Sequence, residues 1–156
     1  MLKESSHQIA ATTGIVAGLL GITGIARVGY YAFTPPSVNR LPLPKHLISL
    51  ESPMGKKLLN ESEIRQDYIP LSTNFETQLR PAYCGVASAV MVLNALGSYK
   101  STYQHFTQDT FFTKKASSIR SPYSVTFSGM SLDELAALLQ SHNRKVEVYH
   151  ASNSTL

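Results

Sequence analysis

The side chains best suited to chemistry lie in one short stretch, residues 77–97, which reads TQLRPAYCGVASAVMVLNALG and holds the only cysteine of the chain, Cys84. Cys84 opens a helix-like run, and the partial positive charge at a helix N-terminus stabilises a thiolate. Gly85 follows it, and a residue without a Cβ lets a substrate backbone approach the sulfur. Gln78 lies six residues upstream, before a turn at Pro81. Its amide can donate a hydrogen bond to an oxyanion beside the sulfur, so the stretch predicts a nucleophile with an oxyanion donor.

A second interpretation of Cys84 is purely structural. Free cysteine is among the most buried residue types, and nearly every side of the predicted helix 84–96 is apolar. A helix that is apolar all round is buried all round. This pattern predicts a central helix with other elements packed on both flanks, and it leaves both roles of Cys84 open.

The surrounding segments predict an α+β fold. Ser52 and Pro53 are suited to begin a short helix, and Ser131 with Glu134 forms a capping box before a leucine stripe. A further short helix is expected within residues 105–113, and loop is expected over residues 65–82 and in the polar region 115–129. The alternating residues 145–150 predict a strand with Val146 and Val148 inward.

The N-terminal part divides into two segments. Residues 9–26 are uncharged but include four glycines and three threonines, and both a cleaved secretory signal and an uncleaved anchor fit them. We therefore interpret residues 1–33 as a signal peptide or membrane anchor, with membrane contact through residues 9–33 if uncleaved. Residues 34–46 form a proline-rich linker, and the folded domain spans residues 47–156. The chain is expected to be exported or membrane-anchored, in the periplasm or membrane if it is bacterial.

The longer segment QLRPAYCGVASAVMVLNALG resembles the nucleophile segment of phytochelatin synthases. FTQDTFF and GMSLDELAALL resemble later parts of the same family, in the same order, so the resemblance covers about residues 52–150. The resemblance is close, particularly to the short bacterial-type members. The Gln78 and Cys84 spacing is also that of papain-like cysteine enzymes, and the resemblance implies the helical half of a papain-like fold with an N-terminal hydrophobic helix.

The resemblance implies a glutathione γ-glutamylcysteinyltransferase in the response to heavy metals. Cys84 would attack the Cys–Gly carbonyl of glutathione, glycine would leave, and the γ-Glu-Cys acyl group would pass to another glutathione or to water. Gln78 would be the oxyanion-hole residue. No organic cofactor is implied. Heavy-metal ions such as Cd and Zn would take part as metal–glutathione thiolates, and the sequence assigns no metal ligands.

The family places its catalytic His and Asp well downstream of the matched positions. Only 72 residues follow Cys84, so we expect this chain to be truncated before that His and Asp. It would then be the N-terminal part of a longer enzyme, a split-gene product or a degraded copy. His105, His142 and His150 are more simply solvated or structural than catalytic. The partner would then be a missing C-terminal half or a second copy in a homodimer.

Composition narrows the other classes of function. The net charge is +4, but the basic residues are scattered and give no clustered footprint for nucleic acid, so no nucleic-acid partner is expected. One cysteine excludes an internal disulfide and multi-cysteine zinc sites in this chain. Two alternatives stay open: a double-glycine leader-type cysteine peptidase, and an inactive membrane-anchored papain-like binding module.

Overall fold

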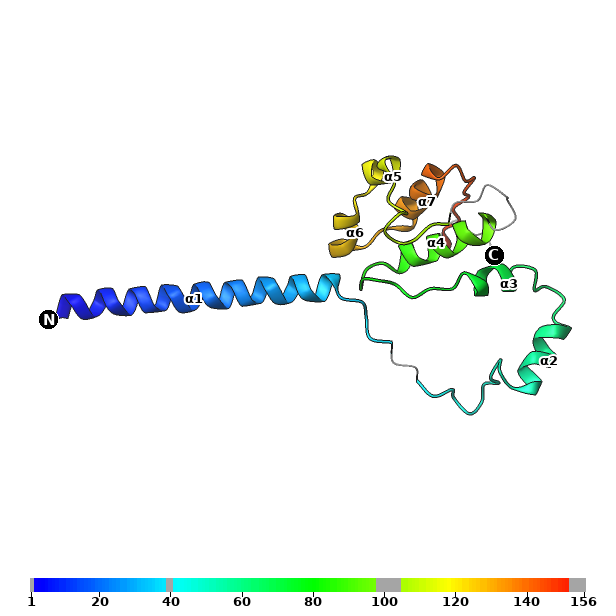
Figure 1. The fold of residues 1–156 in the computed structure, drawn as a ribbon, viewed down its shortest axis with the longest axis horizontal. Coiled ribbons are helices and arrows are strands. Elements are labelled where there is room, and N and C mark those ends of the chain that lie inside the picture. Colours follow the sequence, from blue (N-terminus) through cyan, green and yellow to red (C-terminus); the bar gives the residue numbers. More distant parts are fainter. Residues whose placement is uncertain (1, 39–40, 98–104, 152–156) are drawn as a thin grey trace.

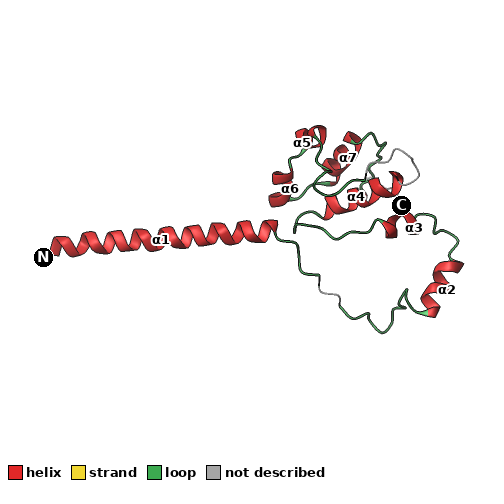
Figure 2. Cartoon of the chain, viewed as in Figure 1, coloured by secondary structure: helices red, strands yellow, loops and turns green. Residues whose placement is uncertain are grey.

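A computed structural model describes residues 2–38, 41–97 and 105–151, with side chains in the first helix described from Gly18 onward. The described residues contain helices and no strand (Figures 1 and 2). The helices are α1 (Leu2–Phe33), α2 (Pro53–Glu61), α3 (Tyr68–Thr73), α4 (Cys84–Gly97), α5 (Lys114–Ile119), α6 (Pro122–Ser128) and α7 (Leu132–Ser141). Helices α3 to α7 gather into one cluster, from which α1 projects as a long rod (Figure 1).

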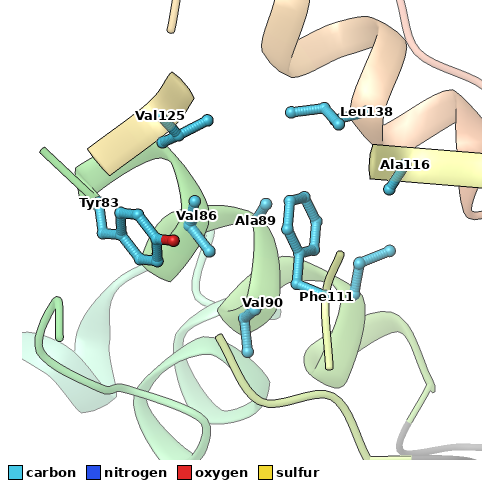
Figure 3. Close-up of a cluster of buried hydrophobic side chains, with 9 residues drawn as sticks. Tyr83, Val86, Ala89, Val90, Phe111, Ala116, Val125 and Leu138 are labelled. Carbon is cyan, nitrogen blue, oxygen red and sulfur yellow. The ribbon is translucent and has the colours of Figure 1, made fainter. Parts of the chain in front are cut away.

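The core of this cluster lies between α4 and the helices that follow it. Val86, Ala89, Val90 and Leu93 of α4 are at most 2% exposed, and their spacing places them on one face of the helix. That face meets the remaining buried side chains, from the segment before α4, the loop after it, and α5, α6 and α7: Tyr83, Phe111, Ala116, Val125 and Leu138 (Figure 3). Burial of this face fixes the orientation of α4, and therefore of Cys84.

The opposite edge of α4 is exposed. Cys84, Ser88, Val92 and Leu96 follow one another at four-residue intervals and all face solvent, with Val92 38% and Leu96 52% exposed. The predicted burial of this helix on all sides is therefore wrong in the described structure, because α4 packs against α3 and α7 but leaves this stripe uncovered. The interpretation of Cys84 as a buried filler is wrong for the same reason.

Capping explains where several helices begin. The Ser52 side chain accepts a hydrogen bond from the Gly55 N–H at 3.0 Å, with Pro53 in the first turn, which confirms the predicted start of α2. Ser131 and Glu134 form the predicted capping box of α7. Thr113 and Ser121 cap α5 and α6 in the same way.

Four predictions of local structure were wrong. Helix α3 lies in a region predicted as loop, and α5 and α6 lie in the polar region predicted as turns. Residues 105–113 form a turn held by Thr107 and Thr110, in place of the predicted helix. Residues 145–150 form no strand: Val146 and Val148 are half-buried as expected, but no neighbouring segment pairs with them among the described residues. Without a partner an extended segment forms no ladder, so the described part is helical and the predicted α+β class is not seen there.

Helix α1 ends where the proline-rich segment begins, and its last residue contacts α6 and the segment before α4. The Phe33 ring packs edge-on against Phe127 of α6 at 5.9 Å between centroids, and the Arg80 guanidinium lies 4.8 Å from the Phe33 ring. Within the described part of the chain, we find no helix that combines the length and the apolar character needed to cross a membrane.

Candidate functional site

Cys84 is the first residue of α4 and is exposed to solvent. The backbone turns into the helix just before it, where the Tyr83 carbonyl accepts the first helical hydrogen bond from the Ala87 N–H at 2.9 Å. The N–H groups of the first turn have no acceptor within the helix. They surround the Cys84 position and give the site its positive partial charge.

An open cleft of about 510 Å³ lies beside Cys84. One wall is α4, through Cys84, Ala87, Ser88 and Met91. The other is formed by residues 75–78 and by residues 36–38 of the proline-rich segment. The structure therefore brings both predicted site residues, Cys84 and Gln78, to one cavity.

Gly85 has a packing role that the sequence did not predict. A Cβ built at this position would lie 2.9 Å from the Met130 sulfur, so the glycine lets the segment before α7 pack closely against α4. The close approach is made by the protein itself. The absence of a Cβ at residue 85 serves the packing that positions Cys84.

The Gln78 side chain is held by the turn that precedes α4. Its Nε2 donates to the carbonyl oxygens of Arg80, at 3.0 Å, and Pro81, at 2.6 Å. Both amide hydrogens are therefore engaged. An oxyanion beside Cys84 can accept from Gln78 only when one of these bonds is released or shared.

Gln108 is a buried residue of the site that the sequence did not single out. It is 1% exposed, and its Oε1 accepts from the Leu79 N–H while its Nε2 donates to the Thr77 carbonyl, both at 2.9 Å. These bonds join residues about 30 positions apart in the chain. No local pattern could have revealed them, because only the fold brings the two segments together.

Glu76 is the second residue that sequence reasoning missed. It lines the cleft, and its Oε1 is buried without a hydrogen-bond partner. Burial raises the pKa of the Glu76 carboxyl above its ordinary value, while the adjacent Gln108 side chain and the positive field of His105 act to lower it. The cleft thus contains a carboxyl group whose neutral form is favoured relative to an exposed glutamate.

The histidines lie elsewhere. None of those whose side chains the structure describes lines the cleft with Cys84. His142 stacks on Phe111, with 4.9 Å between ring centroids, and burial lowers its pKa below the ordinary value. His150 lies on the surface, 3.3 Å from Asp133. These positions agree with the prediction that His142 and His150 are structural or solvated.

Metal ligands were left unassigned by the sequence. In the described ranges, no three or more His, Cys, Asp or Glu side chains are grouped so that they could hold a metal ion.

Comparison with known proteins gives one family. The model of the family described as phytochelatin synthase matches residues 38–156. Among curated proteins, glutathione gamma-glutamylcysteinyltransferase 2 of Arabidopsis thaliana is 29% identical over 128 residues, which cover 77% of this chain and 27% of that protein. Glutathione gamma-glutamylcysteinyltransferase 1 of Lotus japonicus is 30% identical over 117 residues, covering 70% of this chain and 22% of the relative. The chain thus spans about a quarter of the length of these relatives. Neither alternative, the leader peptidase or the inactive module, is favoured by these matches.

Proposed function

Because this chain belongs to the phytochelatin synthase family, we propose that it carries the nucleophile of a γ-glutamylcysteinyl transfer site with glutathione as the acyl donor. The observation that carries the proposal is the exposed thiol of Cys84 at the start of α4, facing an open cleft that Gln78 also lines. The fold we propose for the whole domain is papain-like, with the described helices as its helical half.

In the proposed reaction the Cys84 sulfur attacks the carbonyl carbon of the Cys–Gly peptide bond of glutathione. A C–S bond forms, the C–N bond breaks, and glycine leaves with a proton on its amine. The γ-Glu-Cys acyl group then passes to the thiol or amine of a second acceptor, or to water. Metal–glutathione thiolates belong to this proposal as substrates, with the metal carried by the substrate.

We propose two sources of hydrogen-bond donors for the oxyanion formed in this step. One is the set of N–H groups at the start of α4, and the other is the Gln78 amide once it exchanges a backbone carbonyl for the oxyanion. The leaving amine also needs a proton donor, and a helix N-terminus cannot deliver one. We propose that a histidine from a further segment or a second copy of the chain supplies this general acid–base function.

Acyl-enzyme formation tests the nucleophile directly. The full chain is incubated with glutathione, and its intact mass and the released glycine are measured. We expect slow labelling of Cys84, no labelling of Cys84→Ser, and normal labelling of Ser88→Ala, which removes the neighbouring hydroxyl of the same cleft. Equal labelling of wild type and Cys84→Ser would overturn the assignment.

A second measurement tests the proposal that the acid–base group comes from another segment. General acid–base assistance contributes typically about 10²–10⁴-fold. Adding the remaining part of a relative's catalytic domain as a second chain should therefore raise glycine release by a factor in that range. Rapid release by this chain alone would contradict the proposal and point to a base within it.

Export is a separate proposal that depends on the uncharged run at residues 9–26. Fractionation of cells that produce the full chain should recover it outside the cytosol. Recovery of full-length protein wholly from the cytosol would contradict export and leave the catalytic proposal untouched.

A further inference from the structure

We propose that Gln108 is a positioning residue for the acyl-transfer site, because its single carboxamide holds the backbone on both sides of Gln78. This inference rests on the proposed function, which makes Gln78 an oxyanion donor. Gln108 lies in the loop between α4 and α5, at a position that the sequence reasoning did not connect with the cleft.

The two hydrogen bonds of Gln108 reach the two peptide planes that flank the Cα of Gln78. The Thr77 carbonyl belongs to the peptide plane before the Cα of Gln78, and the Leu79 N–H belongs to the plane after it. Gln108 binds both groups at 2.9 Å. A residue has only two soft backbone dihedrals, φ and ψ, which relate its Cα to these two planes. Anchoring both planes to one rigid amide therefore fixes the backbone conformation of Gln78.

The local chain offers little other restraint. Residues 75–79 lie outside any helix, and Thr77 and Leu79 are exposed. Gln108 is 1% exposed, so its amide is enclosed by the protein and is a firm support. A fully buried amide that satisfies two backbone groups acts in place of a neighbouring strand.

The side chain of Gln78 is restrained separately. Its amide donates to the Arg80 and Pro81 carbonyls, so stabilising an oxyanion requires the amide to leave one of them. With the backbone fixed by Gln108, this change is a rotation of the side chain alone. Without that support the same change includes movement of the loop, and a misplacement of about 1 Å reduces rates by as much as ~10²-fold.

The test compares two reactions of the same thiol in the full chain. Acylation by p-nitrophenyl acetate forms an S-acetyl bond at Cys84 and expels p-nitrophenolate with its electron pair, through a tetrahedral oxyanion. Alkylation by iodoacetamide forms a C–S bond and expels iodide without any oxyanion. The ratio of the two rate constants therefore reports oxyanion stabilisation and cancels changes in thiol exposure or ionisation.

We expect Gln78→Ala and Gln108→Ala each to lower this ratio by about 10- to 100-fold, with the alkylation rate nearly unchanged. Gln140→Ala is the matched control, because Gln140 is an exposed glutamine on α7 outside the cleft. It should leave both rates unchanged. A loss of both rates in parallel in Gln108→Ala would show a merely structural role and overturn the inference.

Gln108→Glu gives a readout that a structural role would not produce. Its carboxylate can still accept from the Leu79 N–H but cannot donate to the Thr77 carbonyl, whereas its protonated form can do both. Glu76 lies beside this carboxamide and titrates in either variant, so Gln108→Ala is the reference for pH dependence. The acylation-to-alkylation ratio of Gln108→Glu should rise more steeply than that of Gln108→Ala as the pH falls. The same pH dependence in both variants would overturn the inference.

The two proposals fail in different ways. If Gln78→Ala lowers the ratio and neither Gln108 variant does, only the positioning role of Gln108 is wrong. If Gln78→Ala leaves the ratio unchanged, the oxyanion role of Gln78 is wrong and the role of Gln108 falls with it. A Cys84 thiol that reacts with neither reagent would overturn the assigned nucleophile and this inference together.

Discussion

At the scale of single residues, the fold contains two titratable side chains whose burial disfavours their charged form, Glu76 in the cleft and His142 away from it. Glu76 lines the cleft with its Oε1 buried and unpartnered, and burial is the main cause of its raised pKa. His142 is enclosed by aromatic rings, with 5.0 Å between its centroid and that of Phe106, and its Nε2 is buried without a partner. Both groups therefore link the stability of the fold to pH, in opposite directions.

Glu76→Gln should stabilise the protein near neutral pH. The folded state raises the pKa of this carboxyl, so the protonated form is favoured on folding. Stability is then highest below the unfolded pKa of about 4.3 and falls as the pH rises through the folded pKa. Glutamine removes the charge, so its advantage should be present at about pH 7 and vanish near pH 4. Thermal unfolding at both pH values checks this, with the exposed Glu63→Gln as control.

For His142 the sign is reversed. Burial lowers its pKa, with the charges of Arg144 and Lys115 acting in the same direction, so the neutral ring is favoured on folding. Stability is complete above the unfolded pKa of about 6.5 and is lost as the pH falls through the folded pKa. His142→Phe keeps an aromatic ring but cannot be protonated, so its free energy of unfolding should depend less on pH between about 7 and 5. An unchanged pH dependence would contradict this role.

The sequence could reveal the residues whose signal is local. Cys84 and Gln78 were found by their spacing around one turn, and both line the cleft. Glu76 and Gln108 were missed because their importance depends on burial and on a contact between distant segments. The packing of Met130 against Gly85 was also missed, because it depends on a contact between distant segments.

At the scale of elements, the last three helices are joined by short, strongly restrained connections. Arg120, at the end of α5, donates to Ser128 at 2.7 Å and to the Gly129 carbonyl at 3.1 Å, and forms an ion pair with Glu134 at 3.0 Å. Glu134 also belongs to the capping box of α7. One arginine thus links α5, the turn after α6, and the start of α7.

Gly129→Ala should destabilise the protein by about 1–3 kcal/mol. Gly129 ends α6 with φ 65° and ψ −153°, a conformation that is essentially restricted to glycine. No atom would contact the new Cβ, so backbone strain alone accounts for the loss. Denaturant unfolding measures the change. Gly24→Ala is the control, because it also has open space but lies within helix α1, and it should not destabilise the protein.

The helices that could be predicted are likewise those whose signals are local in the sequence. Ser52 and Ser131 were recognised as caps, and α2 and α7 begin after them. Helices α5 and α6 also have caps, Thr113 and Ser121, but they are only 6 and 7 residues long and their polar composition hides the single buried faces that stabilise them. The strand expected at residues 145–150 has the right alternation. A partner segment is needed to turn alternation into a strand, and the sequence of one segment cannot supply it.

At the scale of the whole molecule, two segments that are far apart in the sequence, residues 36–38 and 75–78, meet at the cleft. Phe33 contacts Phe127 and Arg80, and residues 36–38 line the same cleft as residues 75–78. Residues 41–61, which include α2, lie away from the helical cluster in Figure 1. The proline-rich segment, interpreted from sequence as a linker, therefore also contributes a wall of the candidate site.

Residues 106–108 are hydrogen-bonded both to the C-terminal part of the central helix α4 and to the segment before its N-terminus. Asn94, near the end of α4, exchanges two hydrogen bonds of 2.9 Å with the backbone of Phe106, and Gln108 holds the segment before Cys84. The amide protons of Phe106 and Leu79 should consequently exchange with solvent through the same opening. We expect Asn94→Ala to accelerate deuterium uptake about tenfold at Phe106 and also at Leu79, since a lost buried hydrogen bond costs about 1–3 kcal/mol. Uptake that rises at Phe106 alone would show that the hydrogen bonds at Asn94 and at Gln108 open independently.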